Sequence, residues 1–268
     1  MRISWLLFIL LLMGRTATAQ PTDSTQIRTS VNMLGVGSTN ILDTYLSQAK
    51  FSGIGFSYLN MTERESSTSQ WSTILQQEIN FSSTHDRSDK ANELQGDYSF
   101  FWGKYYNWYF LDQRLKIQAG GLVNANIGFI YNTVNSNNPA QARLSAQLMP
   151  SGIATYNFTL WEKHFALRYE LDLPLVGIMF SPNYGQSYYE IFSQGNYDHN
   201  VVPTTFVSAP NLRQQLSIDW NAGRTWTLRI GYLGHYQQAQ VNNLKSHIYA
   251  HRFMIGFVKR FQILRYRP

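Results

Sequence analysis

The sequence predicts an all-β fold: a transmembrane antiparallel β-barrel of about ten strands, preceded by a cleaved signal peptide. Three observations predict it. Apolar and polar residues alternate with a period of two over many segments, as in a strand with two chemically different faces. After residue 20 no apolar run approaches the ~20 residues that a transmembrane helix needs. Finally, tryptophan recurs close to the short predicted connections.

The composition argues against several broad classes of protein. Of the 268 residues, 14% are charged, 44% are hydrophobic and 15% are aromatic, and there is no cysteine. An ordinary soluble domain carries about 25% charged residues. So many aromatic residues with so little charge argue against a disordered chain. An exported protein without cysteine must be stabilised by hydrogen bonds and packing instead of disulfides.

The first nineteen residues have the three parts of a secretory signal peptide. Arg2 supplies a positive charge, residues 5–13 are an apolar run, and residues 17–19 form a small-residue cleavage site. The run is too short to span a bilayer, although a membrane-anchoring helix is the alternative. We therefore expect residues 1–19 to be removed and residues 20–268 to form one barrel domain. Loss of Arg2 and Arg15 lowers the formal net charge from +6 to +4.

Seven segments alternate clearly and three alternate weakly, which gives ten predicted strands. In residues 92–102, Leu94 and Trp102 share one face while Glu93 and Asp97 share the other. The other clear segments are residues 71–81, 115–129, 167–173, 212–220, 226–232 and 253–257. The weaker segments are residues 30–37, 52–61 and 141–160.

Residues 141–160 are the least regular of these segments, because Pro150 cannot donate to a strand ladder. A hairpin at residues 149–152 would divide the segment in two. The apolar residues before and after Pro150 have the same parity, however, and one bent strand explains this more simply. We therefore expect a single strand.

The predicted connections alternate between two kinds. One set is mostly short and comprises residues 62–69, 103–114, 161–164 and 221–224. The other set is generally longer and comprises residues 38–50, 83–90, 131–140, 174–210 and 236–246. Short turns at one end and long loops at the other are typical of outer-membrane barrels, with the short turns in the periplasm. An even number of strands then places both termini on the periplasmic side.

The six tryptophans that follow the signal peptide lie in or near the short connections. An indole ring combines a large apolar area with one hydrogen-bond donor, so it favours the membrane–water interface. A sandwich core gives no reason to gather tryptophan at one end. We therefore predict a membrane-interface girdle made by Trp71, Trp102, Trp108, Trp161, Trp220 and Trp226.

The polar face carries charge deep within the strands. In a barrel this face lines the interior, where opposite charges neutralise one another away from bulk water. A secreted soluble β-sandwich or jelly roll would tolerate the same charges on an exposed face, and it is the alternative fold. The predicted lumenal network comprises Glu78, Glu93, Asp97, Lys116, Arg143, Arg168, Glu170, Asp172, Arg213, Asp219, Arg229 and Arg252.

Two stretches rich in glycine and aromatic residues carry a family resemblance. Leu34-Gly35-Val36-Gly37-Ser38-Thr39-Asn40 and Gly53-Ile54-Gly55-Phe56-Ser57-Tyr58 resemble a Bacteroidota family of outer-membrane barrels of unassigned function. The resemblance covers most of the chain after residue 19. It implies an outer-membrane location in a Gram-negative bacterium, with outer-membrane lipid as a partner, and it supplies no catalytic residue.

Phosphate-binding, zinc-protease and nucleophile-elbow motifs are missing from the sequence, and its basic residues are interleaved with acids. We therefore expect no cofactor, no metal site and no nucleic-acid partner. Side chains largely fill a barrel of this size, which leaves at most a narrow path for small solutes. Strand glycines such as Gly55 could widen that path or make room for neighbouring arginines.

Two histidine–aspartate pairs provide an alternative function. His85-Asp86 falls in the second predicted outer loop and Asp198-His199 in the fourth. A carboxylate beside an imidazole can orient it to activate water. Outer-membrane proteases of the omptin family also have ten strands and use Asp/Asp and Asp/His pairs at their rim. Order and spacing differ here, so their catalytic roles are not assigned, and chance occurrence in polar loops is the simpler interpretation.

The segment 174–210 is the most distinctive predicted loop, because seven aromatic residues and Ile191 lie in it among Gly and Asn. A connection this long is often functional. It could recognise an extracellular ligand or protein, or it could pack on itself as a cap over the barrel mouth. We interpret the chain as a monomeric, non-enzymatic structural or surface-interaction barrel, or a narrow small-solute conduit. A surface hydrolase and a secreted sugar-binding sandwich are the alternatives.

Overall fold

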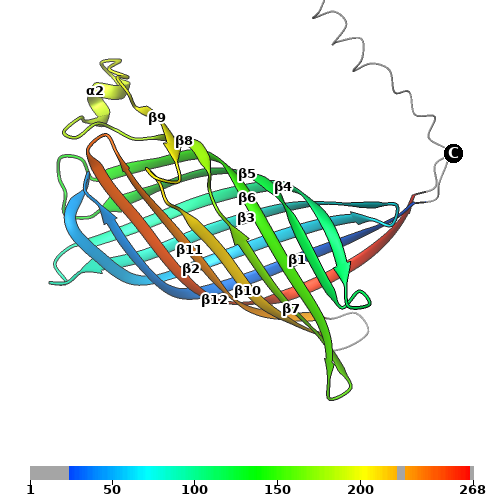
Figure 1. Ribbon diagram of the computed structural model, residues 1–268. Helices are drawn as coiled ribbons and strands as arrows, with labels where there is room; N and C mark the ends of the chain where they lie inside the picture. Colours follow the sequence, from blue (N-terminus) through cyan, green and yellow to red (C-terminus); the bar gives the residue numbers. More distant parts are fainter. Residues whose placement is uncertain (1–23, 222–226, 266–268) are drawn as a thin grey trace, which may run out of the picture.

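The computed structural model describes residues 24–221 and 227–265, which form a closed antiparallel β-barrel (Figure 1). Ten strands make the wall, and the pairing of β1 with β12 closes it. The wall strands are β1 (Ser24–Asp43), β2 (Ser47–Ser66), β3 (Ser69–Asp86), β4 (Asn92–Phe110), β5 (Leu115–Asn132), β6 (Ala140–Leu160), β7 (Lys163–Asp172), β10 (Leu212–Asn221), β11 (Thr227–Val241) and β12 (Leu244–Arg265). The barrel predicted from the alternation is confirmed.

The wall strands point alternate side chains outward and inward. On β2, Ile54 and Phe56 are 61% and 62% exposed, whereas Leu59 and Met61 are buried. Nine of the ten wall strands expose large apolar residues, for example Leu34, Ile54, Phe81, Trp102, Ile127, Leu148, Leu167, Leu216 and Phe253. The wall is one closed sheet, so no second sheet covers this apolar exterior, and the sandwich interpretation is wrong.

The segment 141–160 forms one strand, as predicted. β6 pairs with β5 along its whole length, with Pro150 opposite Gly121. The carbonyl of Pro150 accepts a hydrogen bond of 3.1 Å from the Leu173 N–H. The missing donor of Pro150 therefore does not interrupt the strand.

Most of the predicted long loops are short turns. The segments 38–50 and 236–246 contain turns only at residues 44–46 and 242–243. The strand β4 likewise continues to Phe110, through most of the predicted connection 103–114. Towards these ends of β1, β2, β11 and β12 both faces carry polar residues, so the hydropathy alternation stops although the backbone pairing continues. Long connections between wall strands are present only at residues 133–139 and in the segment 174–210 among the described residues.

The segment 174–210 is more ordered than a loop. It contains β8 (Val176–Phe180), α2 (Tyr188–Phe192) and β9 (Val201–Thr205). β8 continues the line of β7 along β6, and β9 pairs with β8 alone, so α2 stands above one end of the barrel (Figure 1). Ser187 and Glu190 form a capping box at the start of α2. No helix in the described part of the chain is long and apolar enough to cross a bilayer.

The interior is not uniformly polar, which corrects the expectation from the alternation. One large buried apolar cluster comprises Val31, Met33, Leu59, Met61, Ile74, Phe101, Tyr105, Leu122, Met149, Ile153, Leu233, Met254 and Val258. A smaller one comprises Ile41, Leu46, Phe51, Ile130 and Ile248. A ten-stranded barrel is narrow enough for side chains to meet across it, so apolar residues pack in the lumen as well as charged ones.

Candidate functional site

A network of buried ion pairs centred on Arg213 crosses the lumen. Arg213 comes from β10 and is 1% exposed. Its Nε lies 3.1 Å from Glu78 Oε2, and its Nη1 lies 2.8 Å from Asp172 Oδ2 and 3.3 Å from Glu170 Oε1. Its Nη2 donates to Gln76 Oε1 at 2.8 Å. Three carboxylates and one amide thus surround the planar guanidinium, which has five donors to share among them.

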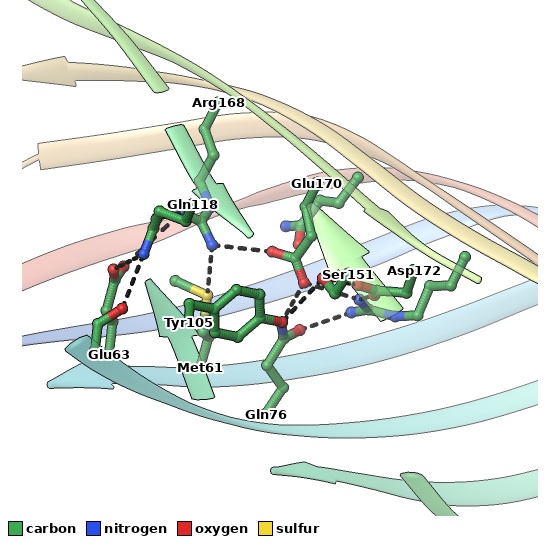
Figure 2. A network of polar contacts seen from close by, with 12 residues as sticks. Met61, Glu63, Gln76, Tyr105, Gln118, Ser151, Arg168, Glu170 and Asp172 are labelled. Atoms are coloured by element: carbon green, nitrogen blue, oxygen red, sulfur yellow. Dashed lines mark hydrogen bonds and ion pairs between the residues drawn. The ribbon is translucent and has the colours of Figure 1, made fainter. Parts of the chain in front are cut away.

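Arg168 on β7 forms a second centre of the network (Figure 2). Its Nη2 lies 2.9 Å from Glu170 Oε2 and 3.8 Å from the Met61 sulfur, and its Nη1 lies 3.8 Å from Glu63 Oε2. Glu63 and Met61 belong to β2, on the opposite side of the ring from β7. The two arginines share Glu170, so the network is continuous.

Neutral side chains complete the coordination of the carboxylates (Figure 2). The Tyr105 hydroxyl donates to Ser151 Oγ at 2.9 Å, and Ser151 Oγ donates to Asp172 Oδ1 at 2.5 Å. Gln76 Nε2 donates to Glu170 Oε1 at 2.5 Å. Polar networks of this kind hold their side chains in one arrangement, because leaving a buried group unpaired is costly.

Most of the predicted lumenal charges lie inside the barrel. Ten of the twelve are buried, while Lys116 and Arg143 are half-buried. Ion pairs involve nine of them, namely Glu78, Lys116, Arg143, Arg168, Glu170, Asp172, Arg213, Asp219 and Arg229. Glu93, Asp97 and Arg252 form hydrogen bonds with neutral groups instead.

Four network members are missing from the sequence prediction. Glu63 and Glu65 both form ion pairs with Lys116, whose Nζ lies 2.8 Å from Glu63 Oε1. Asp43 faces Arg143 at 4.0 Å, and His235 Nδ1 lies 3.2 Å from Glu78 Oε1. Leu59 and Met61 face inward, and every second residue after them is Glu63 and then Glu65. Extending the predicted strand beyond residue 61 would therefore have identified the two glutamates as inward-facing.

A cavity lies between this network and the segment that carries α2, and we call it the vestibule. Its volume is about 50 Å³, enough for a few water molecules or a very small solute, and it opens to solvent. Arg213 and Phe101 line it from the network side, and Phe180 and Ser181 line it from the α2 side. The remaining wall combines amides with apolar groups, among them Asn124, Asn126, Gln141, Gln237, Met149, Met179 and Leu212.

Arg143 is the loosely held cation of the vestibule. Its Nη2 lies 3.1 Å from Gln237 Oε1, and its Nη1 lies 4.0 Å from Asp43 Oδ2. Arg213, by comparison, has four close acceptors. Among the described residues Arg143 therefore keeps N–H groups that are available to a ligand.

The α2 segment is anchored over the mouth of the barrel by Tyr188. The Tyr188 hydroxyl accepts a hydrogen bond of 2.7 Å from the Ala142 N–H and donates to Gln141 Oε1 at 2.9 Å. Its ring meets Tyr45 edge-on at 5.8 Å, and burial raises the pKa of Tyr188, so its hydroxyl stays protonated. Ile191 on α2 is fully buried. The segment therefore acts as a cap on its inner side.

The outer side of the same segment remains open. Tyr184, Tyr189, Phe192 and Tyr197 are 64–68% exposed. The inner side of the segment thus packs over the mouth, and its outer side is an exposed aromatic surface; recognition of an extracellular ligand or protein there stays a prediction.

Among the described residues, no hydrogen bond or ion pair joins the two histidine–aspartate pairs. His199 contacts its neighbour Asp198, and their side chains are 83% and 71% exposed. Asp86 accepts hydrogen bonds from Ser88 and from the N–H groups of Lys90 and Ala91. These bonds lower the pKa of Asp86 to about 2, so this carboxylate organises its own turn.

The predicted girdle tryptophans lie on the outer surface where they are described. Trp71, Trp102, Trp108 and Trp161 are 42–84% exposed. Trp220 is half-buried, with the Lys163 ammonium 5.6 Å from its ring centre. Trp226 lies outside the described residues. The assignment of these side chains to a membrane interface remains a prediction.

Several solved structures share the barrel architecture. The translocator domain of the autotransporter NalP from Neisseria meningitidis is 12% identical, with a TM-score of 0.40 over 97% of this chain and 95% of that chain. Neisserial surface protein A is 10% identical, with a TM-score of 0.35 over 90% of this chain and 100% of that one. The attachment invasion locus protein Ail of Yersinia pestis, in complex with sucrose octasulfate, is 13% identical, with a TM-score of 0.31 over 87% and 99%. The likeness is confined to the fold.

Sequence comparison gives the family. No curated protein sequence matches the chain. A family model described as "Protein of unknown function (DUF3316)" matches residues 4–268, which is nearly the whole length. The chain therefore belongs to this family.

Proposed function

We propose that this protein is a non-enzymatic outer-membrane barrel of a Gram-negative bacterium that holds a small polar ligand in its vestibule. The observation that carries the proposal is the position of the Arg213 network beneath a cavity capped by α2. In this proposal the network closes the route through the barrel, whereas the cavity opens to solvent. Binding at the outer mouth therefore has a structural basis that transport lacks.

The membrane location is supported by the surface of the barrel. Large apolar residues on nine wall strands have no protein layer over them, and hydrocarbon is the solvent that suits such a belt. In this proposal residues 1–19 direct export, the mature chain is a monomer, both termini are periplasmic and α2 lies outside the cell. Protease added to intact cells should then cut within residues 181–200 and leave the barrel whole. Recovery of the chain in the soluble periplasmic fraction would contradict the location.

The closed lumen has a direct electrical test. We expect the purified protein to give no stepwise conductance in planar bilayers, because buried side chains from opposite walls meet in the network. Arg213→Ala removes the central cation and should produce measurable current. Conductance steps in the unaltered protein would instead support the narrow-conduit alternative.

Ligand binding is expected at Arg143 and the surrounding amides. Amide and guanidinium donors favour hydroxyl-rich or anionic small molecules, and the apolar side of the vestibule accepts their carbon skeleton. We would screen small carboxylates and short polyols by thermal shift of the detergent-solubilised protein. A true ligand should lose affinity with Arg143→Gln and keep it with Arg87→Gln, an exposed change in the β3–β4 turn. A compound that raises the melting temperature of both variants equally does not bind in the vestibule.

A further inference from the structure

The wall strands separate charge by sign between their two faces. All ten acidic residues of the described wall strands occupy inward-facing positions, namely Asp43, Glu63, Glu65, Glu78, Asp86, Glu93, Asp97, Glu170, Asp172 and Asp219. Seven exposed basic residues occupy outward-facing positions, namely Arg28, Lys50, Arg64, Lys104, Lys163, Lys245 and Lys259. On the outer face of the described wall strands every charged residue is therefore basic, and no acidic residue shares that face with them.

The outward cations fall into two rows separated by the apolar belt. On β2, Lys50 and Arg64 are fourteen residues apart, with Ile54 and Phe56 exposed between them. On β12, Lys245 and Lys259 have the same spacing. Fourteen residues at about 3.3 Å span roughly 46 Å, or about 35 Å along the axis of a barrel whose strands tilt by ~40°. This matches the distance between the headgroup levels of a bilayer, with a hydrocarbon core of ~30 Å.

The row at the end that holds the termini contains an unusual pair of arginines. Arg28 on β1 lies directly opposite Arg64 on β2, and both side chains are exposed on the outer face. Like charges at directly opposed positions of an antiparallel pair destabilise the sheet. Among the described residues neither guanidinium has a hydrogen bond or ion pair. The nearby Glu63 and Glu65 point into the lumen and hold Lys116 there.

We propose that Arg28 and Arg64 form a binding site for the phosphate of an anionic phospholipid in the periplasmic leaflet. Two planar guanidinium groups side by side can each donate two hydrogen bonds to one phosphate, and its charge removes their mutual repulsion. On the same face of β1, Ser30 and Asn32 separate this pair from the exposed apolar residues Leu34 and Val36, so polar groups lie between the phosphate and the belt where the acyl chains of the same lipid would lie. The proposal rests on the membrane location proposed above.

The test compares phosphatidylglycerol bound by three forms of the full-length protein. These are the unaltered chain, the double variant R28Q/R64Q, and the control K50Q/K245Q, which removes two charges from the opposite row. Each is incorporated into nanodiscs of phosphatidylcholine with an equal part of phosphatidylglycerol, and bound lipid is counted by native mass spectrometry after release. We expect R28Q/R64Q to bind phosphatidylglycerol about tenfold more weakly, because each basic group near an anionic lipid contributes substantially to binding. The control should retain it.

The outcomes separate cleanly. Equal retention by R28Q/R64Q and the unaltered chain overturns the lipid site, whereas failure of the folded unaltered chain to enter nanodiscs overturns the membrane location instead. Displacement of the lipid by inorganic phosphate at matched concentration would assign the pair to free phosphate and overturn the lipid assignment. If the double variant does not fold, the single variants R28Q and R64Q are compared. Undiminished phosphatidylglycerol binding by both single variants would likewise overturn the lipid site. R28K/R64K, which keeps the charge, should recover part of the binding.

Discussion

The Arg213 guanidinium meets the Glu78 carboxylate across the full width of the barrel, with Nε 3.1 Å from Oε2. β10 and β3 are five strands apart in a ring of ten, so this contact joins opposite walls. Arg213 also holds Glu170 and Asp172 from β7. One side chain thus links three strands across the lumen.

Replacing Arg213 by Met should destabilise the barrel strongly. The change leaves Glu78, Glu170 and Asp172 buried without their central cation, and breaking a buried pair in this way costs about 3–5 kcal/mol. Urea unfolding in lipid vesicles, followed by tryptophan fluorescence, measures the loss. Arg87→Met, an exposed change in a turn, is the control. An unfolding midpoint equal to that of the control would show that the network contributes no stability.

Gly55→Val should disturb the side chain of Arg252. A Cβ at position 55 would lie 2.8 Å from Arg252 Cζ and 2.6 Å from Thr39 Oγ1, so this glycine makes room for an arginine. Overpacking of this kind costs about 1–3 kcal/mol. The matched control is Gly152→Val on β6, where nothing lies within 4 Å of an added Cβ. Heat-modifiable gel mobility compares the two, and equal melting of both variants would refute the steric argument.

Tyr188→Phe should loosen the cap over the vestibule. The change removes the hydroxyl that accepts from the Ala142 N–H and donates to Gln141, while the ring stays. Loss of a buried hydrogen-bonding group costs about 1–3 kcal/mol locally. Limited proteolysis should cut residues 181–200 faster in this variant. Tyr189→Phe changes a neighbouring residue that is 66% exposed and should leave the rate unaltered. The same rate in both variants would mean that these bonds do not hold the cap.

Asp86→Asn should loosen the β3–β4 turn in a manner that depends on pH. The hydrogen bonds to Asp86 lower its pKa to about 2 from a usual value of 3.8. Its ionised form therefore stabilises the turn fully above pH 3.8, and this contribution is lost as the pH falls through about 2. Near neutral pH the amides of Lys90 and Ala91 should exchange hydrogen faster in the variant.

The exchange experiment has an internal control. Asp89→Asn alters a neighbouring exposed residue of the same turn whose side chain forms no hydrogen bond among the described residues. Its amide exchange should match that of the unaltered protein. The difference caused by Asp86→Asn should also vanish below pH 2, and a difference that persists there would exclude the carboxylate as its source.

Alternation along the chain was sufficient to predict the barrel, the number of wall strands and the single strand across Pro150. It also placed twelve charged residues on the inward face, since a period of two follows directly from strand geometry. It failed at strand ends, where Glu63, Glu65 and Asp43 lie beyond the predicted limits because both faces become polar there. It also could not find β8 and β9, which are five-residue strands inside a long connection.

The sequence by itself determined which face of each strand is apolar, which residue types share the other face, and hence the class of fold. The partners within that face depended on tertiary structure. Arg213 and Glu78 are 135 positions apart, and the meeting of Arg28 with Arg64 depends on the register between two strands. Ring closure and strand register set these distances, whereas hydropathy records only the side of the wall on which a residue lies.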